Sequence, residues 1–536
     1  MEKINGRKLS LIFIFILILL VIALLVGKFT YSYLGPTISD DLETQGEVTA
    51  SGDTLIFTKG NNLSLSATTD NFTTGGTNLT STTNPKVKLV ASTKTNQASA
   101  TYYVGVLIKN NTYVYTTSGK TPELILTIKD EKGNNVSSGV DGLTYVTSGG
   151  VSGFDVTGKK GLFNIKMDYP ISTTSSSAGT THTWTFTLTF VNLGTDQSGN
   201  ENASMNVDIY LQKEEYKLPL NEYVISLYTG TQGENGLYYH TSTLANGAGD
   251  NSYRYAGPSD TTNNFVCFGS DAATCPTDNL YRIIGVFEDK VKLIKYDYAT
   301  SVLLGTDGDY SGSGTPSSKY YKGSLSSVNT YYWNYKAASK QSNVWSTSLL
   351  SKTNLNTNFI NNIGSSWANK IATTTWQVGG NTNANIRDAV PAVAYTNEIK
   401  SPAENIAYDA KIGLMYASDY GFGAVPEAWT VTLFDYEGVD GLIITTQNWM
   451  HMGYDEWTVS RFSEDDGVAF FVHDYGSVSI SDVDYKRGVR PVFNLESTVV
   501  YVSGSGTQSD PIRINWMTDS FEEPIKLTVS LVRNTW

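Results

Sequence analysis

The hydrophobic positions of this chain form one unbroken run and many short alternating runs. The unbroken run lies within 9–27 and is long enough for a helix that crosses about 30 Å of hydrocarbon. Lys3, Arg7 and Lys8 come before it, and positive charge ahead of a first span holds the N-terminus in the cytoplasm. The pattern predicts a cytoplasmic stub (1–8) and a transmembrane signal anchor, with the rest of the chain exported.

A cleaved signal peptide is the alternative explanation of this run. Its apolar core would be unusually long, and the residues after Val26 offer no A-x-A cleavage site. No cysteine directly follows the run, which excludes an acylated lipid anchor. We therefore expect a single-pass cell-membrane protein whose C-terminal part is extracellular, and cleavage stays open.

Alternation with a period of two dominates the region 48–213. In one of its runs, Trp184, Phe186 and Leu188 share one parity and threonines occupy the other. Such alternation is typical of an antiparallel strand with one buried face, and clusters of Gly, Asn and Ser between the runs are typical of turns. We predict an all-β sandwich that serves as a stalk, joined to the anchor by a linker (28–47).

The region 220–515 shows mixed periodicity. Apolar runs at 279–287 and 291–295 flank a polar corner, which favours a β-hairpin. Apolar residues recur at every fourth position in one helical stretch, at Phe359, Ile363, Trp367 and Ile371. We predict an α+β recognition domain here, followed by a strand-like tail (516–536).

Composition limits the partners of the exported part. The chain carries 51 acidic against 38 basic side chains, for a net charge of −13, and the basic residues around the apolar run leave the exported part more acidic still. An acidic surface repels nucleic-acid phosphates. We therefore expect no nucleic-acid partner.

The two cysteines, Cys267 and Cys275, have seven residues between them. In the oxidising surroundings outside a cell, this spacing favours a local disulfide. A structural zinc site needs four ligands, and no other cysteine or histidine neighbours the pair in the sequence. We predict a disulfide that closes a short loop.

An ordered series of motifs in the second region gives a family resemblance. The series is, in chain order, Phe265-Val266-Cys267-Phe268-Gly269-Ser270, Cys275-Pro276, Leu280-Tyr281-Arg282-Ile283-Ile284-Gly285, Trp457-Thr458-Val459-Ser460-Arg461 and Gly488-Val489-Arg490-Pro491-Val492-Phe493-Asn494-Leu495. It resembles an uncharacterised domain at the C-termini of anchored or secreted surface proteins of Gram-positive-type bacteria. The resemblance implies a location and an architecture, and no activity.

A more distant likeness is to C-type-lectin-like domains of the sulfatase-modifying-factor kind. Those domains place a strand with Trp and Arg before a closing Gly-(Phe/Val)-Arg strand, similar to Trp457…Arg461 and Gly488-Val489-Arg490 here. The catalytic cysteines of the enzymatic members are missing. The likeness implies a scaffold that displays a ligand site, not an oxidase.

Candidate catalytic residues are few. His473 and Asp474 look like a base and its orienting acid, but neighbours on a strand point to opposite faces and cannot form a dyad with each other. His473 could still pair with a distant Ser or Asp. The chain has no G-x-S-x-G motif, so nucleophilic catalysis is not expected.

A glycoside hydrolase would need two carboxylates that flank the scissile bond. The acids near tryptophans or aromatic loops are Glu427, Asp435, Glu437, Asp455 and Glu456. Acids on loops are usually only solvated, so a surface glycoside hydrolase is the alternative function and not the leading one.

Two oxygen-rich turns, Glu464–Gly467 and Asp482–Asp484, raise the question of Ca²⁺. Neither has the Asp-x-Asp-x-Asp-Gly spacing of an EF-hand loop. His451 and His473 lack a further ligand at helical or hairpin spacing, which argues against zinc. We expect no cofactor, with Ca²⁺ in the acidic turns as the alternative.

Aromatic residues cluster late in the chain, in Gly- and Asp-rich sequence. The candidate ligand-binding residues are Trp429, Trp449, Tyr454, Trp457 and Arg461. Aromatic faces on rigid loops stack on sugars or anchor protein partners. Two alternatives stay open: the tryptophans belong to the core, and the arginine pairs with a buried acid or carbonyl.

The leading interpretation is a membrane-anchored bacterial cell-surface protein with a non-enzymatic function. Its second exported domain would bind extracellular carbohydrate or a surface protein, as in adhesion. A surface glycoside hydrolase is the alternative, and a structural fibre or wall-associated subunit is the third.

Overall fold

A computed structural model divides the chain into two compact units, described separately below. The N-terminal unit comprises Met1–Tyr216 and Thr518–Trp536, and the C-terminal unit comprises Lys217–Met517. The structure describes residues 45–50, 52–58, 65–67, 69–109, 111–213, 215–317, 319–335, 342–438, 444–516 and 526–533. The predicted anchor at 9–27 lies outside these residues, and none of the helices within them is long and apolar enough to cross a membrane.

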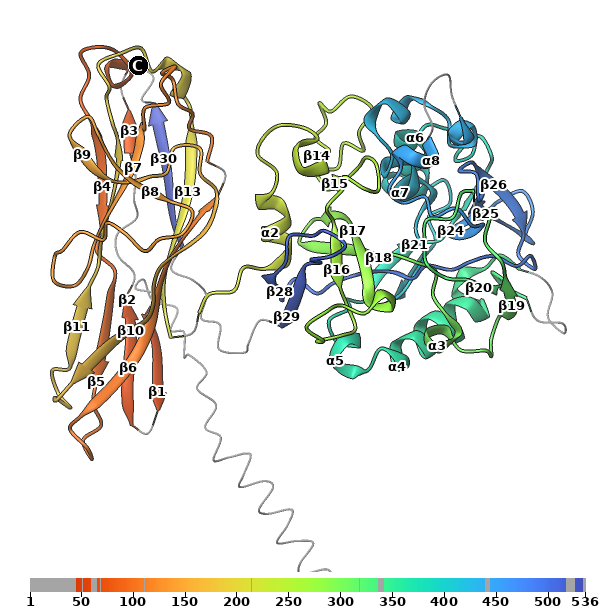
Figure 1. The fold of residues 1–536 in the computed structure, drawn as a ribbon, viewed down its shortest axis with the longest axis horizontal. Helices are drawn as coiled ribbons and strands as arrows, with labels where there is room; N and C mark the ends of the chain where they lie inside the picture. The colour runs from red at the N-terminus through yellow and green to blue at the C-terminus, as the bar shows by residue number, and fades with distance from the viewer. Residues whose placement is uncertain are drawn as a thin grey trace, which may run out of the picture. The chain divides into compact units, whose positions relative to one another are not determined.

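The described part of the N-terminal unit is built from β-sheets (Figure 1). The first sheet has the order β1 (Gln45–Ala50), β2 (Asp53–Thr58), β5 (Lys86–Val90) and β11 (Thr180–Thr183). The second has the order β10 (Gly161–Thr173), β6 (Ala98–Lys109), β13 (Ser204–Gln212), β30 (Lys526–Arg533) and β3 (Leu65–Ala67). The third has the order β4 (Leu79–Thr83), β12 (Thr185–Phe190), β7 (Leu124–Lys129), β9 (Val151–Asp155) and β8 (Thr144–Ser148).

The three sheets share one hydrophobic core. Phe57 of β2, Val106 of β6 and Phe186 of β12 belong to the same buried cluster. Alternation produces this burial, because Phe186 and Leu188 are buried while Thr185 and Thr187 between them are half-buried. The β-rich character predicted from the alternation is therefore confirmed.

A strand from the far end of the sequence completes the second sheet. β30 pairs antiparallel with β13, where Val529 lies opposite Met205 and Leu527 opposite Val207, and it pairs in parallel with β3. Met205 and Val207 are both buried. The tail that the sequence presents as a separate strand-like segment thus contributes to the N-terminal unit.

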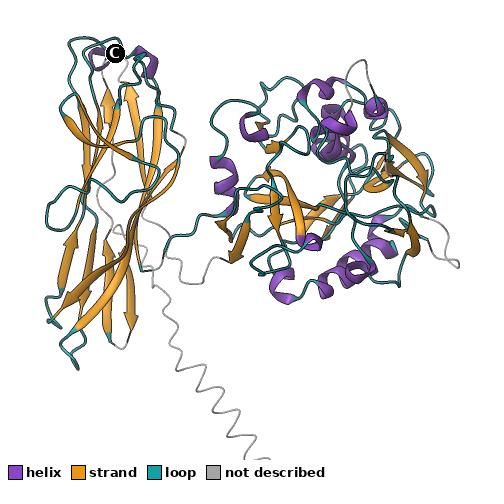
Figure 2. Ribbon diagram, in the orientation of Figure 1, coloured by secondary structure: helices purple, strands orange, loops and turns teal. Residues whose placement is uncertain are grey.

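The C-terminal unit combines small sheets with short helices, as Figure 2 shows. Its largest sheet has the order β14 (Leu237–Tyr239), β15 (Tyr253–Tyr255), β17 (Leu280–Phe287), β18 (Lys290–Lys295) and β27 (Val492–Asn494), with β16 (Phe265–Cys267) paired to β17. A second sheet has the order β22 (Gly380–Asn381), β24 (Glu456–Phe462), β25 (Val468–Val472) and β26 (Val478–Asp482). The remaining strands pair two by two: β19 (Tyr310–Gly314) with β20 (Val328–Tyr331), β21 (Thr374–Gln377) with β23 (Ala407–Ala410), and β28 (Val499–Ser503) with β29 (Arg513–Trp516).

The helices are short and lie mainly in the C-terminal unit. The α-helices are α2 (Leu220–Ser226), α3 (Ser301–Leu304), α4 (Ile360–Asn362), α5 (Ser365–Ala368), α6 (Pro391–Tyr395), α7 (Ala417–Phe422) and α8 (Ile444–Gln447). Two π-helical segments are η6 (Leu350–Phe359) and η7 (Thr396–Lys400). The 3₁₀ turns are η1 (Thr69–Phe72), η2 (Ser198–Asn200), η3 (Glu234–Gly236), η4 (Thr277–Asn279), η5 (Trp345–Thr347), η8 (Pro426–Thr430) and η9 (Leu433–Glu437).

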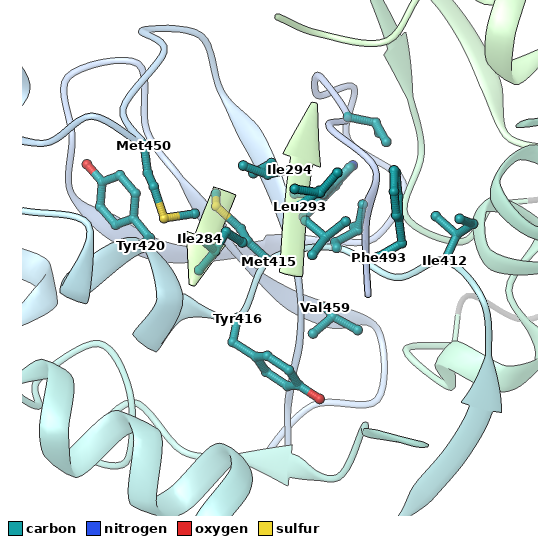
Figure 3. Packing of buried hydrophobic residues seen from close by; sticks show 14 of the residues in the cluster. Ile284, Leu293, Ile294, Ile412, Met415, Tyr416, Tyr420, Met450, Val459 and Phe493 are labelled. Atoms are coloured by element: carbon teal, nitrogen blue, oxygen red, sulfur yellow. The ribbon is translucent and has the colours of Figure 1, made fainter. Parts of the chain in front are cut away.

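The predicted hairpin is present as β17 and β18 and forms the centre of this unit's core. Its apolar residues pack with those of β27 and of the segment before α7; Figure 3 shows Ile284, Leu293 and Ile294 near Phe493 and Met415. A single buried cluster includes all five side chains. The packing of the hairpin in the core therefore fixes the position of the residues at its corner, between β17 and β18.

The predicted helix is interrupted. Helical backbone continues from η6 into α4 and stops before Gly364, whose φ of 82° lies in the left-handed region. Glycine adopts this conformation without steric cost and ends helices for that reason. The four-residue periodicity therefore crosses a break, although Phe359, Trp367 and Ile371 are all buried.

The predicted disulfide is confirmed. Cys267, at the end of β16, and Cys275 form a disulfide, with their Cα atoms 5.8 Å apart. Arg513 of β29 donates from both terminal nitrogens to the carbonyls of Ala272 and Ala273, at 2.8 Å each. The short loop is thus held at its base by the disulfide and near its tip by a guanidinium.

Truncation of the hairpin core should destabilise the C-terminal unit. We expect Leu293→Ala to lower the free energy of unfolding by about 2–5 kcal/mol, because the side chain is fully buried and a cavity would remain. Val302→Ala, at a side chain that is 79% exposed, should change it by less than about 0.5 kcal/mol. Denaturant unfolding followed by tryptophan fluorescence measures the free energy of unfolding of both variants. Equal losses in the two variants would contradict the conclusion that this hairpin is the centre of the core.

Candidate functional site

The three tryptophans of the predicted ligand-binding set lie in the core. Trp429, Trp449 and Trp457 are at most 1% exposed. Each indole N–H donates to a backbone carbonyl: Trp429 to Ala424 at 3.0 Å, Trp449 to Tyr255 at 2.8 Å and Trp457 to Tyr331 at 2.9 Å. The alternative noted from the sequence, that they are core residues, is what the structure shows.

The other two members of the set hold the second sheet in place. Tyr454 is half-buried, and its carbonyl accepts a hydrogen bond from the Tyr298 hydroxyl at 2.8 Å. Arg461 contacts the Glu404 carboxylate and donates to Asn343 at 3.2 Å. The structure therefore does not bring the five predicted residues together into one exposed patch.

One cluster of titratable groups forms at the tip of the β25–β26 hairpin. His473 lies just after β25, and its Nδ1 is 3.4 Å from Oδ1 of Asp455. Arg487 contacts the other oxygen of Asp455, and the Asp474 N–H donates to Oδ1 at 3.0 Å. His473 and Asp474 lie in the turn after β25 and not on the strand, so their side chains converge with Asp455 and do not point to opposite faces as the sequence suggested. The ion-pairing partner of His473 is Asp455, a distant aspartate that sequence spacing could not identify.

The pKa values of the two carboxyl groups in this cluster, Asp455 and Asp474, are shifted in opposite directions. Burial favours a higher pKa for Asp455, but the hydrogen bond from His473 and the charge of Arg487 outweigh it, and the pKa is lowered. Burial and the negative charge of Asp455 raise the pKa of Asp474. Asp455, His473 and Asp474 are also the one group among the described residues with the spacing of metal ligands. Arg487 already pairs with one oxygen of Asp455.

A larger concave site lies beside the β17–β18 hairpin. Its cavity has a volume of about 500 Å³, within the range of small-molecule sites. The lining residues come from the Asp250 loop, the hairpin corner, β21, the end of α6, η7 and β27: Asp250, Ser252, Phe287, Glu288, Lys290, Thr373, Thr374, Thr375, Tyr395, Ile399 and Asn494. Hydroxyls, an amide and carboxylates thus share the wall with two aromatic rings, and we call this space the hairpin cavity.

A buried ion network lies directly behind the hairpin cavity. Arg254 pairs with Asp250 at 2.7 Å and lies 3.9 Å from Asp419, which in turn accepts a hydrogen bond from Lys292 at 2.5 Å. Arg254 and Asp419 are each 1% exposed. The network contains two carboxylates, Asp250 and Asp419, and two cations, Arg254 and Lys292, so its charges sum to zero. Buried charges are tolerated when they are paired in this way.

Aromatic rings enclose the guanidinium of this network. The Arg254 Cζ atom lies 4.7 Å from the centre of Phe287, 4.8 Å from Tyr395 and 4.9 Å from Phe422. Ring faces attract cations at these distances. Because Phe287 and Tyr395 also line the hairpin cavity, the network fixes two of its walls.

Asp250 connects the network to the cavity. Its carboxylate accepts hydrogen bonds from the Tyr395 hydroxyl at 2.7 Å and from the Ser252 hydroxyl at 2.6 Å, in addition to Arg254. Burial favours a higher pKa for Asp250, but Arg254 and the hydroxyl donors outweigh it and hold the pKa well below its usual range. Asp250 is therefore a fixed, ionised wall of the cavity.

The corner of the hairpin brings an exposed carboxylate to the cavity rim. Glu288 connects β17 and β18 with a φ of 55°, the left-handed region that favours glycine or asparagine. Such a conformation costs about 1–2 kcal/mol for a residue with a side chain. A glutamate in a strained turn at the mouth of a cavity suggests a role beyond the turn itself.

Two further cavities in this unit have no ion network behind them among the described residues. One of about 450 Å³ lies along the disulfide loop, and one of about 490 Å³ lies beside Tyr238 and Asn235. Neither is backed by a charge network comparable to the one behind the hairpin cavity among the described residues. The hairpin cavity is therefore the candidate functional site.

Comparison with known proteins adds no identification. No protein-family model and no curated protein matches the chain. From the sequence, none of the lining residues is assigned to a binding site, although the polar corner at 288–290, which contains Glu288 and Lys290, is recognised. That corner was the one available signal, because the other lining residues come from segments far apart in the chain.

The charge on Asp250 should make stability depend on pH in a defined direction. Its folded-state pKa lies below that of an unfolded aspartate, about 3.9, so ionised Asp250 stabilises the fold above that pH and the contribution is lost as pH falls below it. We expect Asp250→Asn to cost about 3 kcal/mol at pH 7, since the buried Arg254 would lose the carboxylate to which it is hydrogen-bonded. The difference from the parent chain should shrink below about pH 4.

Denaturant unfolding of both proteins between neutral and acidic pH measures this difference. Asp482→Asn is the matched control, because Asp482 is an exposed aspartate at the end of β26. Its effect should stay below about 0.5 kcal/mol at every pH. A cost of Asp250→Asn that is the same at all pH values would show that the ionised carboxylate does not stabilise the network.

Proposed function

We propose that this chain is a membrane-anchored bacterial cell-surface protein that binds an extracellular carbohydrate in the hairpin cavity without catalysis. The N-terminal unit would be a β-sandwich stalk and the C-terminal unit the recognition domain. The observation that carries the proposal is a cavity walled by hydroxyls, an amide, carboxylates and aromatic rings on a fixed ionic support. The anchor, the surface location and the family likeness rest on the sequence.

The chemistry of the wall suits a polyhydroxylated ligand. Sugar hydroxyls donate to carboxylates such as Glu288 and accept from amides such as Asn494, while their C–H faces pack on rings such as Phe287. Rigid walls lower the cost of binding because little side-chain freedom is lost. A sugar is therefore a better fit than a protein surface, which requires a broad flat contact.

We also propose a C-type-lectin-like arrangement for the C-terminal unit. The two motif segments behind that likeness lie side by side, since Glu456 forms a parallel bridge with Gly488. Arg490 reinforces the contact with a hydrogen bond from Nε to the Glu456 carboxylate at 2.8 Å. This pairing supports the likeness at the level of local topology.

A surface glycoside hydrolase is the second candidate function. The observation in its favour is the pair Asp455 and Asp474, which lie together at the tip of the β25–β26 hairpin with pKa values shifted in opposite directions. Their nearest carboxylate oxygens are within 4.8 Å, whereas glycoside hydrolases separate the two groups by about 5–9.5 Å, so this function ranks below carbohydrate binding. Shortened glycans after incubation, lost in Asp455→Asn, would support it. The third interpretation, a structural fibre or wall-associated subunit, stays a prediction.

Binding should depend on the rim carboxylate. We expect the full-length protein to bind a defined glycan on an array, and Glu288→Gln to weaken that binding about tenfold or more, because a charge-assisted hydrogen bond contributes about 1.5–3 kcal/mol. Glu464→Gln, in an exposed acidic turn away from the cavity lining, is the matched control and should bind normally. Unchanged binding by Glu288→Gln would contradict the assignment of the cavity.

A glycine at the same position should separate stability from binding. Glu288→Gly relieves the left-handed backbone conformation, so we expect the free energy of unfolding to rise by about 0.5–1 kcal/mol. Glycan affinity should fall as in Glu288→Gln, because the carboxylate is lost. Thermal unfolding and calorimetric titration of the same preparation test both, and a stability gain with full affinity would make Glu288 only a turn residue.

A further inference from the structure

The strand register in the second sheet of the C-terminal unit brings three metal-ligating side chains together. β24 and β25 are antiparallel, with Glu456 opposite Val472. Asp455 directly precedes β24 and His473 directly follows β25, so the same register places these two residues side by side. Asp474 is the next residue in the turn before β26. Sequence spacing gives His473 no second ligand, because its neighbour belongs to a different strand.

The distances in this cluster match those between the ligands of a metal ion. The ligand atoms of Asp455, His473 and Asp474 all lie within 4.8 Å of one another, and Nδ1 of His473 is 3.4 Å from Oδ1 of Asp455. A charge-assisted hydrogen bond between such groups is shorter, about 2.7–2.9 Å. Two ligands that are each about 2.0–2.1 Å from a tetrahedral metal ion are about 3.3–3.4 Å apart. The observed separation therefore suits two ligands of one ion.

Contacts around the cluster fix the orientation of the ligands. Arg487, which is 6% exposed, contacts Oδ2 of Asp455 and leaves Oδ1 on the side of His473. Oδ1 accepts the Asp474 N–H at 3.0 Å, and its second lone pair stays available for a metal ion. The His473 ring stacks on the Tyr475 ring, with centroids 4.4 Å apart. Outer contacts of this kind orient the ligands in metal sites.

The charges of the cluster favour a cation. Two carboxylates and the Arg487 guanidinium sum to −1 when His473 is neutral. Burial and the negative charge of Asp455 raise the pKa of Asp474, so the two carboxylates repel each other at this distance. A divalent cation between them would replace this repulsion with attraction. All three side chains are partly exposed, so an ion can reach them from solution.

We propose that Asp455, His473 and Asp474 bind one divalent transition-metal ion of the zinc class. The ligands are Oδ1 of Asp455, Nδ1 of His473 and a carboxylate oxygen of Asp474, which leaves a fourth position for water or a solute. An imidazole nitrogen in the set favours Zn²⁺ over Ca²⁺ and Mg²⁺, because those two ions prefer oxygen ligands.

A bound ion would connect the start of β24 to the turn between β25 and β26. It would bind only the folded arrangement, because the ligands come from separate segments, and it would therefore stabilise the fold. The ion would also occupy both Asp455 and Asp474, the carboxylates that the glycoside hydrolase candidate requires. Zinc binding and hydrolysis by this pair thus exclude each other, whereas the hairpin cavity is unaffected.

Calorimetric titration with Zn²⁺ tests the proposal on the full-length protein, without an affinity tag and after treatment with a chelator. We expect one equivalent of Zn²⁺ to bind and to raise the temperature of thermal unfolding. Equimolar Ca²⁺ should not displace it. No saturable binding of Zn²⁺ would overturn the site, and displacement by equimolar Ca²⁺ would overturn the assigned class of metal.

Matched variants locate the bound ion. His473→Gln and Asp474→Asn should each weaken Zn²⁺ binding more than about 100-fold, because the loss of an outer contact alone costs about 10–100-fold. The controls are His182→Gln, at a half-buried histidine of the N-terminal unit, and Asp482→Asn, at the exposed end of β26. Both controls should bind Zn²⁺ as the parent chain does.

Thermal unfolding in the presence of a chelator checks that each variant folds. His473 and Asp474 lie in a partly exposed turn, so we expect both variants to unfold at the temperature of the metal-free parent chain. Full Zn²⁺ affinity in His473→Gln, or a loss of binding in His182→Gln, would overturn the assignment of the ligands.

Discussion

The ion network formed by Asp250, Arg254, Asp419 and Lys292 is the constraint on which the C-terminal unit depends. Each residue belongs to a different segment, so the four charges can neutralise one another only if β15, β18, α7 and the Asp250 loop take their observed positions. Removing any single partner would leave a buried charge uncompensated. The network therefore determines how these four segments are arranged, in addition to stabilising that arrangement.

The two units solve the same problem of buried charge in different ways. The C-terminal unit pairs carboxylates with Arg254 and Lys292, and it surrounds the guanidinium with aromatic rings. The N-terminal unit surrounds Glu123 with neutral donors from Thr116, Gln197 and Asn200. An ion pair compensates a buried charge with an opposite charge, whereas neutral donors compensate it through hydrogen bonds alone.

Local patterns in the sequence predict local structure well here and tertiary neighbours poorly. The alternation around Trp184, the hairpin at 279–295 and the Cys267–Cys275 disulfide all follow from residues close in sequence, and all are present. The place of β30 and the pairing of His473 with Asp455 depend on contacts between distant segments. No periodicity or spacing carries that information, because many partners are compatible with the same local pattern.

The tryptophans illustrate why composition points to the wrong surface. A Trp in Gly- and Asp-rich sequence suits an exposed binding loop, but it equally suits an irregular core in which loop carbonyls accept the indole N–H. Trp429, Trp449 and Trp457 all find such carbonyls, so they support the fold from inside. The hairpin cavity instead uses smaller groups held by that fold, and its one strained residue, Glu288, lies where the rigid hairpin turns toward solvent. Recognition in this unit would thus depend on the core indirectly, through the walls that the core and the ion network keep in place.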